Sequence, residues 1–185
     1  MPVVISLLRA VNVGGTSIIK MAELRVLYES LEFKDVETYI QSGNVVFRTQ
    51  EKDLAKLAKR IQAAIARRFG AKPQVILRTA HEMRKVVARN PFAKRRGIEP
   101  SKLLCLFLAE KLSAEACAEL RALSLPSEEL IPSGSELFIY FSNGIGKSNL
   151  SWSKLEKTST GPGTGRNWNT VIKLLAMAEA IEAAN

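Results

Sequence analysis

The sequence predicts an α+β protein built from two ferredoxin-like units (βαββαβ type), each an antiparallel sheet with helices on one face, followed by a C-terminal helix. Three observations predict this fold. Hydrophobic periodicity in the first half alternates between strands and helices in the order β-α-β-β-α-β. The second half repeats that plan. A short turn containing Ser-Gly precedes one of the strands in each half.

The first unit opens with an apolar strand and contains the clearest helix of the chain. Leu57, Ile61 and Ile65 recur with the period of one helical face, and Gly70 and Pro73 end that helix. In chain order we predict a strand at 3–9, a helix at 21–31, strands at 36–40 and 45–48, a helix at 52–69 and a strand at 74–78.

The second unit is predicted from the repeat. The letters AELR occur at 22–25 and again at 118–121, and each copy is followed by a strand, a Ser-Gly turn and another strand. LLCLFL at 103–108 corresponds to VVISLL at the N-terminus. The predicted divisions are an N-terminal unit at 1–79, a helical and basic connector at 80–102, a second unit at 103–160, and a loop with the final helix at 161–185.

The composition narrows the class of protein. Hydrophobic residues make up 46% of the 185 residues, which fits a globular chain and excludes a disordered one. The longest apolar runs are too short to cross a bilayer, and the N-terminus lacks the basic region of a signal peptide. Cys105 and Cys117 form no CxxC pair. We therefore expect a cytoplasmic protein without a membrane partner.

Positive charge is concentrated in the middle of the chain. The net charge is +9, and the stretch 52–102 holds most of the excess of Lys and Arg. Such a face attracts nucleic acid or other acidic partners, although a basic helix face is also simply a solvated one. The candidate nucleic-acid contacts are Lys56, Lys59, Arg60, Arg67, Lys94, Arg95 and Arg96.

Polar residues also stand at strand ends, where an apolar core needs none. One cluster follows the first strand and another joins the next two strands. Glycines allow backbone N–H groups to approach an anion, and arginine binds phosphate or carboxylate in a bidentate manner. The alternative is a plain strand-to-helix connection that requires positive φ. The candidate ligand-binding residues are Arg9, Asn12, Gly14, Gly15, Lys20, Gln41, Ser42 and Asn44.

Two later segments add candidates. Lys147 and Ser148 end the run SNGIGKS, which lacks the first glycine of a P-loop because residue 141 is Phe, and which fits a simpler anion site at a helix N-terminus. Arg166 and Asn167 open the last helix in the run TGRNWNT. The alternative for this run is capping and docking of that helix.

The stretches LLRAVNVGG at 7–15, YIQSGNVVF at 39–47 and RNWNT at 166–170 resemble an uncharacterised, largely bacterial protein family known only as a domain of unknown function. The chain departs from the family pattern at Ala10, where the family favours glycine. The resemblance implies a cytosolic, metal-free protein of two ferredoxin-like units, and it implies no activity.

The residues favour binding of a phosphorylated or carboxylated small molecule, such as a nucleotide, in a cleft between the two units. The alternatives are a nucleic-acid-binding module that uses the basic stretch Lys52–Lys102, and a role in protein interaction. His81 is the only histidine, and no carboxylate pair or metal-ligand cluster predicts a reaction. We expect neither metal nor cofactor, and nothing in the pattern predicts an oligomeric state.

Overall fold

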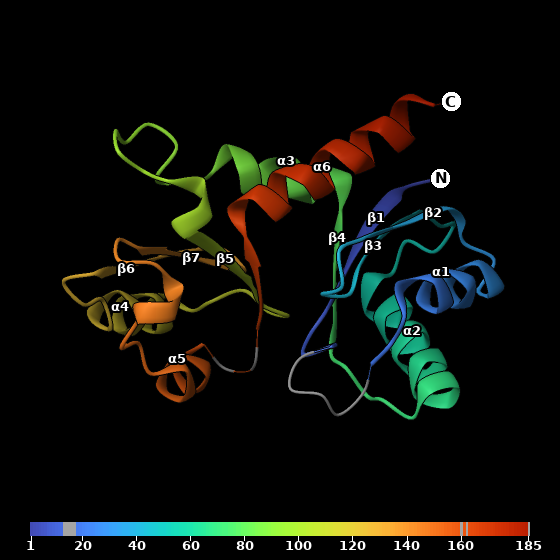
Figure 1. Ribbon diagram of the computed structural model, residues 1–185, viewed down its shortest axis with the longest axis horizontal. Helices are drawn as coiled ribbons and strands as arrows, with labels where there is room; N and C mark the ends of the chain where they lie inside the picture. The colour runs from blue at the N-terminus through green and yellow to red at the C-terminus, as the bar shows by residue number, and fades with distance from the viewer. Residues whose placement is uncertain (13–17, 160, 162, 185) are drawn as a thin grey trace. The chain divides into compact units, whose positions relative to one another are not determined.

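Two four-stranded antiparallel sheets carry the fold, each with helices packed on it, as the sequence predicts (Figure 1). The computed structural model describes residues 1–12, 18–159, 161 and 163–184. The chain divides into unit 1, formed by Met1–Lys85 and Lys173–Asn185, and unit 2, formed by Val86–Ile172. It passes from one unit to the other within helix α3 (Ala80–Ala88) and again within helix α6 (Trp168–Ala183).

Unit 1 has the strand order β2-β3-β1-β4 of a ferredoxin-like sheet. The central strand pairs on both sides, so that Ile5 lies opposite Val46 on one neighbour and Arg78 on the other. The elements are β1 (Val3–Leu8), α1 (Met21–Ser30), β2 (Lys34–Tyr39), β3 (Asn44–Arg48), α2 (Leu54–Phe69) and β4 (Val75–Thr79).

The ends of α2 follow from local chemistry. The Asp53 carboxylate accepts hydrogen bonds from the N–H groups of Ala55 and Lys56, which have no partner inside the helix. Gly70 has φ +68° and closes the helix in the left-handed conformation. Between these ends the apolar face, including Leu57 and Ile61, packs with α1 against one face of the sheet.

The C-terminal half of α6 covers the opposite face of the same sheet, as Figure 1 shows. Its buried positions Leu174, Ala178 and Ile181 recur with helical spacing. Arg48 on β3 is buried on this face and donates to the Ile181 carbonyl, while its Nε donates to Asp35 at 2.7 Å. Strands β1 and β3 are therefore buried along their length, while the edge strand β2 keeps exposed positions.

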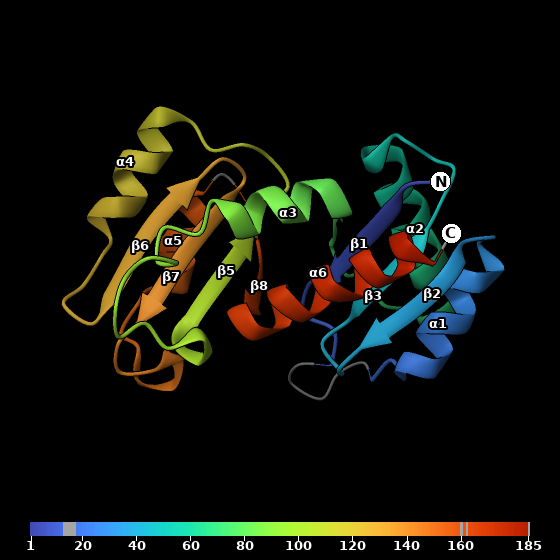
Figure 2. The ribbon, with the colours of Figure 1, turned by 90° about the horizontal axis from the view of Figure 1, so that it is seen from above.

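Unit 2 repeats the topology with the strand order β6-β7-β5-β8 (Figure 2). A core of leucines, with Ile139 and Phe141, lies between the sheet and its two helices. The elements are β5 (Leu103–Phe107), α4 (Ala114–Ala122), β6 (Glu128–Ser133), β7 (Glu136–Phe141), α5 (Trp152–Thr158) and β8 (Thr164–Asn167).

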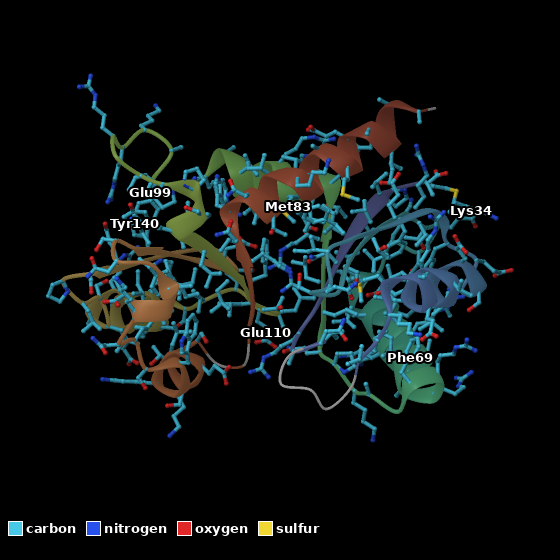
Figure 3. The ribbon with its side chains drawn as sticks, in the orientation of Figure 1. Lys34, Phe69, Met83, Glu99, Glu110 and Tyr140 are labelled. Atoms are coloured by element: carbon cyan, nitrogen blue, oxygen red, sulfur yellow. The ribbon has the colours of Figure 1, made fainter. Side chains whose placement is uncertain are left out.

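The other face of the unit 2 sheet is covered by aromatic side chains. Trp168 from the start of α6 lies with its ring centroid 6.0 Å from that of Phe138. Phe92 packs against Tyr140 at 5.7 Å, and Tyr140 is labelled in Figure 3 close to Glu99, in the loop that crosses this face. The Tyr140 hydroxyl donates to the Gly97 carbonyl at 3.4 Å.

One expected element differs. The segment ahead of the last helix was expected to be a loop, but Thr164–Asn167 forms β8 and pairs with β5. A strand of four residues with three polar side chains and a glycine shows no hydrophobic alternation. Its pairing depends on the tertiary fold, because Gly165 leaves room for Leu104. A Cβ at that glycine would stand 3.2 Å from Leu104 Cδ2.

Candidate functional site

The structure brings together the two polar clusters that the sequence places at strand ends of unit 1. The Asn12 side-chain Nδ2 donates to the carbonyls of Ile19 at 2.9 Å and Gln41 at 2.8 Å. The Ile19 N–H donates back to Asn12 Oδ1 at 2.7 Å. One side chain therefore ties the segment after β1 to the start of α1 and to the turn between β2 and β3.

Backbone contacts hold the same segments close together. The N–H of Leu8 donates to the Gly43 carbonyl at 2.9 Å, and the N–H of Arg9 donates to the Gln74 carbonyl at 2.9 Å. Gly43 approaches β1 so closely that a Cβ there would lie 2.8 Å from Leu8 Cβ. Glycine is required at this turn for space as well as for its φ of +73°.

Left-handed backbone is concentrated in this loop cluster, defined here by residues 9–12, 18–20 and 40–44. Ala10 has φ +56°, Asn12 +59° and Ile40 +48°. Among the described residues, only Glu32 and Asp35 are further non-glycine residues with positive φ. This conformation costs an L-residue about 1–2 kcal/mol and is rare for a β-branched side chain. Glycine at position 10 would adopt this conformation without that cost.

The predicted ligand residues of unit 1 divide into two groups. Asn12 and the buried Asn44 hold the loops, since Asn44 Nδ2 donates to the Tyr39 carbonyl at 3.1 Å and to Ser42 Oγ at 3.0 Å. The side chains at the surface are Arg9 and Ser42, which are half-buried, and Lys20 and Gln41, which are exposed. Gly14 and Gly15 lie outside the described residues.

The sequence predicts Lys147 and Ser148 at the N-terminus of an α-helix, but the structure does not place them there. Lys147 ends a single 3₁₀ turn at Ile145–Lys147 and Ser148 follows it, while α5 begins only at Trp152, capped by the Ser151 hydroxyl. The Ser148 hydroxyl accepts from the Leu150 N–H at 3.0 Å, while Lys147 is exposed. The spacing of GKS in the sequence gives no sign of the extra turn.

Arg166 and Asn167 lie on β8 and at the start of α6. Arg166 is buried, and its Nη1 donates to Thr164 Oγ1 at 2.7 Å and to the Gly165 carbonyl at 2.9 Å. Burial lowers the pKa of its guanidinium to about 10. Asn167 Oδ1 accepts from the Asn169 N–H at 3.0 Å, which caps α6, and its Nδ2 donates to the Ser101 carbonyl at 2.8 Å. These contacts favour capping and docking.

The basic residues proposed to contact nucleic acid lie in two places. Lys56, Lys59, Arg60 and Arg67 are exposed on α2 in unit 1. The other three, Lys94, Arg95 and Arg96, are exposed in the loop after Phe92 in unit 2. In that loop Arg95 is paired, because its Nη1 lies 2.6 Å from Glu129 Oε2 and its guanidinium stands over the Phe92 ring.

A hollow of about 220 Å³ in unit 2 was not predicted from the sequence. It is lined mainly by apolar atoms, and none of the predicted ligand residues lines it. The residues that line it are Ala122, Leu123, Leu125, Asn149, Leu150, Ser151 and Lys154. Because its lining comes from a helix end, two loops and a short helix, no local pattern in the sequence marks it.

Two further kinds of site are absent from the described part of the chain. No group of three or more His, Cys, Asp or Glu side chains is placed there to hold a metal ion. No described helix is both long and apolar enough to cross a membrane. His81 is exposed at the start of α3.

Two ferredoxin-like units, with a polar loop cluster at one end of the first sheet, define the class of protein. The chain belongs to the family described as protein of unknown function DUF1697, whose model matches residues 1–138. The family resemblance predicted from the polar clusters is thereby confirmed. The chain is also similar to the solved structure of the conserved bacterial protein SP0830 from Streptococcus pneumoniae. The two are 25% identical, with a TM-score of 0.72, over 96% of this chain and 98% of that one. Among curated proteins no sequence matches.

Proposed function

We propose that unit 1 binds a phosphorylated or carboxylated small molecule at the loop cluster. The observation that carries this proposal is the concentration of left-handed backbone where Asn12 joins the two loops. Strained backbone of this kind persists only where surrounding contacts enforce it, and it gathers at ligand-binding and active sites. Here the enforcing contacts are the three hydrogen bonds of the Asn12 side chain.

The side chains around these loops suit an anion. Lys20 and Gln41 are exposed, and Arg9 and Ser42 are partly accessible. Cationic groups would neutralise a phosphate or carboxylate, while an amide and a hydroxyl would orient it. Turns that contain left-handed residues also present backbone N–H groups as an anion-binding concavity.

The sequence suggested that Arg166 and Asn167 of unit 2 also contact the ligand, and this proposal does not use them. Arg166 and Asn167 are engaged in contacts within unit 2. A ligand shared between the two units, and contacted by Lys147 or Ser148, stays a prediction. The test below addresses unit 1 alone, so its outcome does not depend on the second unit.

The test is thermal unfolding of the purified protein with pyrophosphate, AMP and citrate, each at constant ionic strength. A ligand at about 100 times its Kd adds about 2.7 kcal/mol, which raises the Tm of a chain this long by roughly 5–10 °C. The shift should shrink in Lys20→Gln and in Gln41→Ala. It should be kept in Lys154→Gln, which makes the same charge change on an exposed lysine of unit 2.

Two outcomes would overturn the proposal. One is the absence of a Tm shift with all three probes at millimolar concentration. The other is a shift of equal size in Lys20→Gln, Gln41→Ala and the wild type, because binding would then lie elsewhere. The unliganded Tm of each variant, measured in parallel, separates lost binding from lost stability.

A further inference from the structure

Helix α2 carries an unbalanced row of positive charge. Its sequence LAKLAKRIQAAIARRF contains five cations and no carboxylate. Lys56, Lys59, Arg60 and Arg67 fall at spacings of three, four and seven residues, which places them along the side of the helix away from the apolar face. Figure 3 shows nitrogen-tipped side chains extending from this helix, whose last residue Phe69 is labelled.

The partners of these cations separate them into two kinds. Lys56 Nζ lies 2.8 Å from Glu51 Oε2, and Arg60 donates to the Leu31 carbonyl at 3.0 Å while standing over the Phe33 ring. Lys59 and Arg67 form no ion pair with any residue that the structure describes. They are the cations of this row that remain available to a partner.

Helix stability does not account for the row. Lys56 and Arg60 are like charges four residues apart, an arrangement that weakens a helix. The neighbouring α1 shows the usual solution, since Arg25 and Glu29 form an i,i+4 pair at 2.9 Å. Arg67 lies in the last turn, where a cation favours the helix dipole, but Lys59 lies in the middle of α2 and gains nothing from it.

We propose that the exposed face of α2, defined by Lys56, Lys59, Arg60 and Arg67, binds the phosphate backbone of double-stranded nucleic acid. The row from Lys56 to Arg67 covers about 16 Å at a rise of about 1.5 Å per residue. Phosphates of one strand follow each other every ~3.4 Å along a duplex, so the row faces roughly four or five of them. This function is independent of the loop cluster.

The form of recognition follows from what α2 and its sheet offer. α2 presents no exposed aromatic side chain on which bases could stack, so its contacts go to phosphates and carry no sequence information. Single strands stacked on the sheet face are disfavoured, because α6 covers that face of unit 1 and Arg48 is buried beneath it. The row therefore fits electrostatic binding to a duplex without sequence specificity.

The test is fluorescence anisotropy with a short labelled DNA duplex, titrated at several salt concentrations. We compare the full chain with Lys59→Glu/Arg67→Glu and with the control Lys154→Glu/Lys157→Glu, which makes the same charge change on exposed residues of α5. Lys59 and Arg67 alone give about two phosphate contacts, and Lys56 and Arg60 bring the number to about four if they leave their partners, so log K should fall with log salt at a slope of roughly −2 to −4. The α2 variant should bind at least tenfold more weakly with a slope about 2 units shallower, and the control should change much less.

Circular dichroism shows whether the Lys59→Glu/Arg67→Glu variant is folded. If it is not, the anisotropy titration is repeated with the milder double variant Lys59→Gln/Arg67→Gln. An equal loss of duplex affinity in the α2 variant and in the control would overturn the proposal, because binding would then depend only on the net charge of the protein. Stronger α2-dependent binding of long-chain polyphosphate or of anionic phospholipid vesicles than of the duplex would also overturn it. The pyrophosphate-induced Tm shift should survive in the α2 variants, so the two proposals can fail separately.

Discussion

The side-chain amide of Asn12 donates to the carbonyl of Gln41 at 2.8 Å, joining two loops whose positions in the sequence are 29 residues apart. Its second amide hydrogen goes to the Ile19 carbonyl, and its oxygen accepts from the Ile19 N–H. Asn12 is thus a positioning residue. Both hydrogens of its amide donate to backbone carbonyls of the protein. Its effect on a ligand would therefore act through the loops that it holds in place.

Replacing Asn12 should therefore loosen the loop cluster. Asn12→Ala removes three hydrogen bonds and leaves alanine at positive φ, so we expect a loss of about 2–4 kcal/mol in the free energy of unfolding. Asn12→Gly loses the same hydrogen bonds, but glycine adopts positive φ without strain. Its loss in the free energy of unfolding should therefore be about 1 kcal/mol smaller than that of Asn12→Ala. Urea unfolding measures both. Equal stability of Asn12→Ala and the wild type would contradict the role given to Asn12.

Gly43 and Gly70 form a matched pair of left-handed glycines. Both have positive φ, at +73° and +68°, but a Cβ at Gly43 would meet Leu8 Cβ at 2.8 Å while Gly70 faces open space. Gly43→Ala should cost about 2–5 kcal/mol, and Gly70→Ala about 1 kcal/mol. A smaller effect at Gly43 than at Gly70 in denaturant unfolding would refute the close approach of this turn to β1.

Ile40 stores conformational strain at an exposed position. Its φ is +48°, and half of its side chain is accessible, so little packing is lost when it is changed. Asparagine tolerates this conformation, and Ile40→Asn should raise the free energy of unfolding by about 1 kcal/mol. Val26→Asn is the control, because Val26 is an equally exposed β-branched residue on α1 with ordinary backbone. A gain of the same size at Val26 would show that the effect comes from surface hydrophobicity.

The buried pair of Ser6 and Tyr28 predicts a dependence on alkaline pH. Their hydroxyl oxygens lie 2.8 Å apart, and burial raises the pKa of the Tyr28 phenol well above its usual value. The folded state then keeps a proton that the unfolded chain loses above about pH 10, so Tyr28 makes stability fall as pH rises from there, by at most ~1.4 kcal/mol per pH unit.

Tyr28→Phe should cost about 1–2 kcal/mol at neutral pH, because it leaves the Ser6 hydroxyl without this partner. The difference from the wild type should narrow as pH rises from about 10 to 11. Urea unfolding at these pH values measures it, and the double variant Ser6→Ala/Tyr28→Phe controls for the orphaned hydroxyl. A gap that widens with pH would contradict the burial of Tyr28 in its neutral form.

The fold was largely predictable because the signals for it are local. The apolar periodicity of α2, its Asp53 cap and its closing Gly70 stand together in one stretch of sequence. The repeat of AELR and the Ser-Gly turns predicts the second unit, and its four-stranded sheet confirms it. β8 was missed because a strand of four residues depends on its partner β5 for its existence.

The candidate site was predictable only in part. The sequence places Asn12 and Gln41 in polar loops, and a hydrogen bond joins those loops in the structure. The sequence could not show that the Asn12 amide donates to the carbonyls of Ile19 and Gln41, or that Arg166 is buried, because these facts depend on the tertiary fold. Asparagine in a loop tolerates left-handed backbone, however, and the place of Asn12 in the loop after β1 could have marked it as a positioning residue.

We proposed that the loop cluster of unit 1 binds anions, and a residue-resolved titration is the sharpest test of that binding. We would record amide proton–nitrogen spectra of the labelled protein while adding pyrophosphate, with chloride at the same ionic strength as the control. Anion binding at the loop cluster should produce saturable shifts of the amides in 9–12, 18–20 and 40–44 that chloride does not produce and that Lys20→Gln weakens. Shifts confined to α2, or none beyond those with chloride, would contradict it.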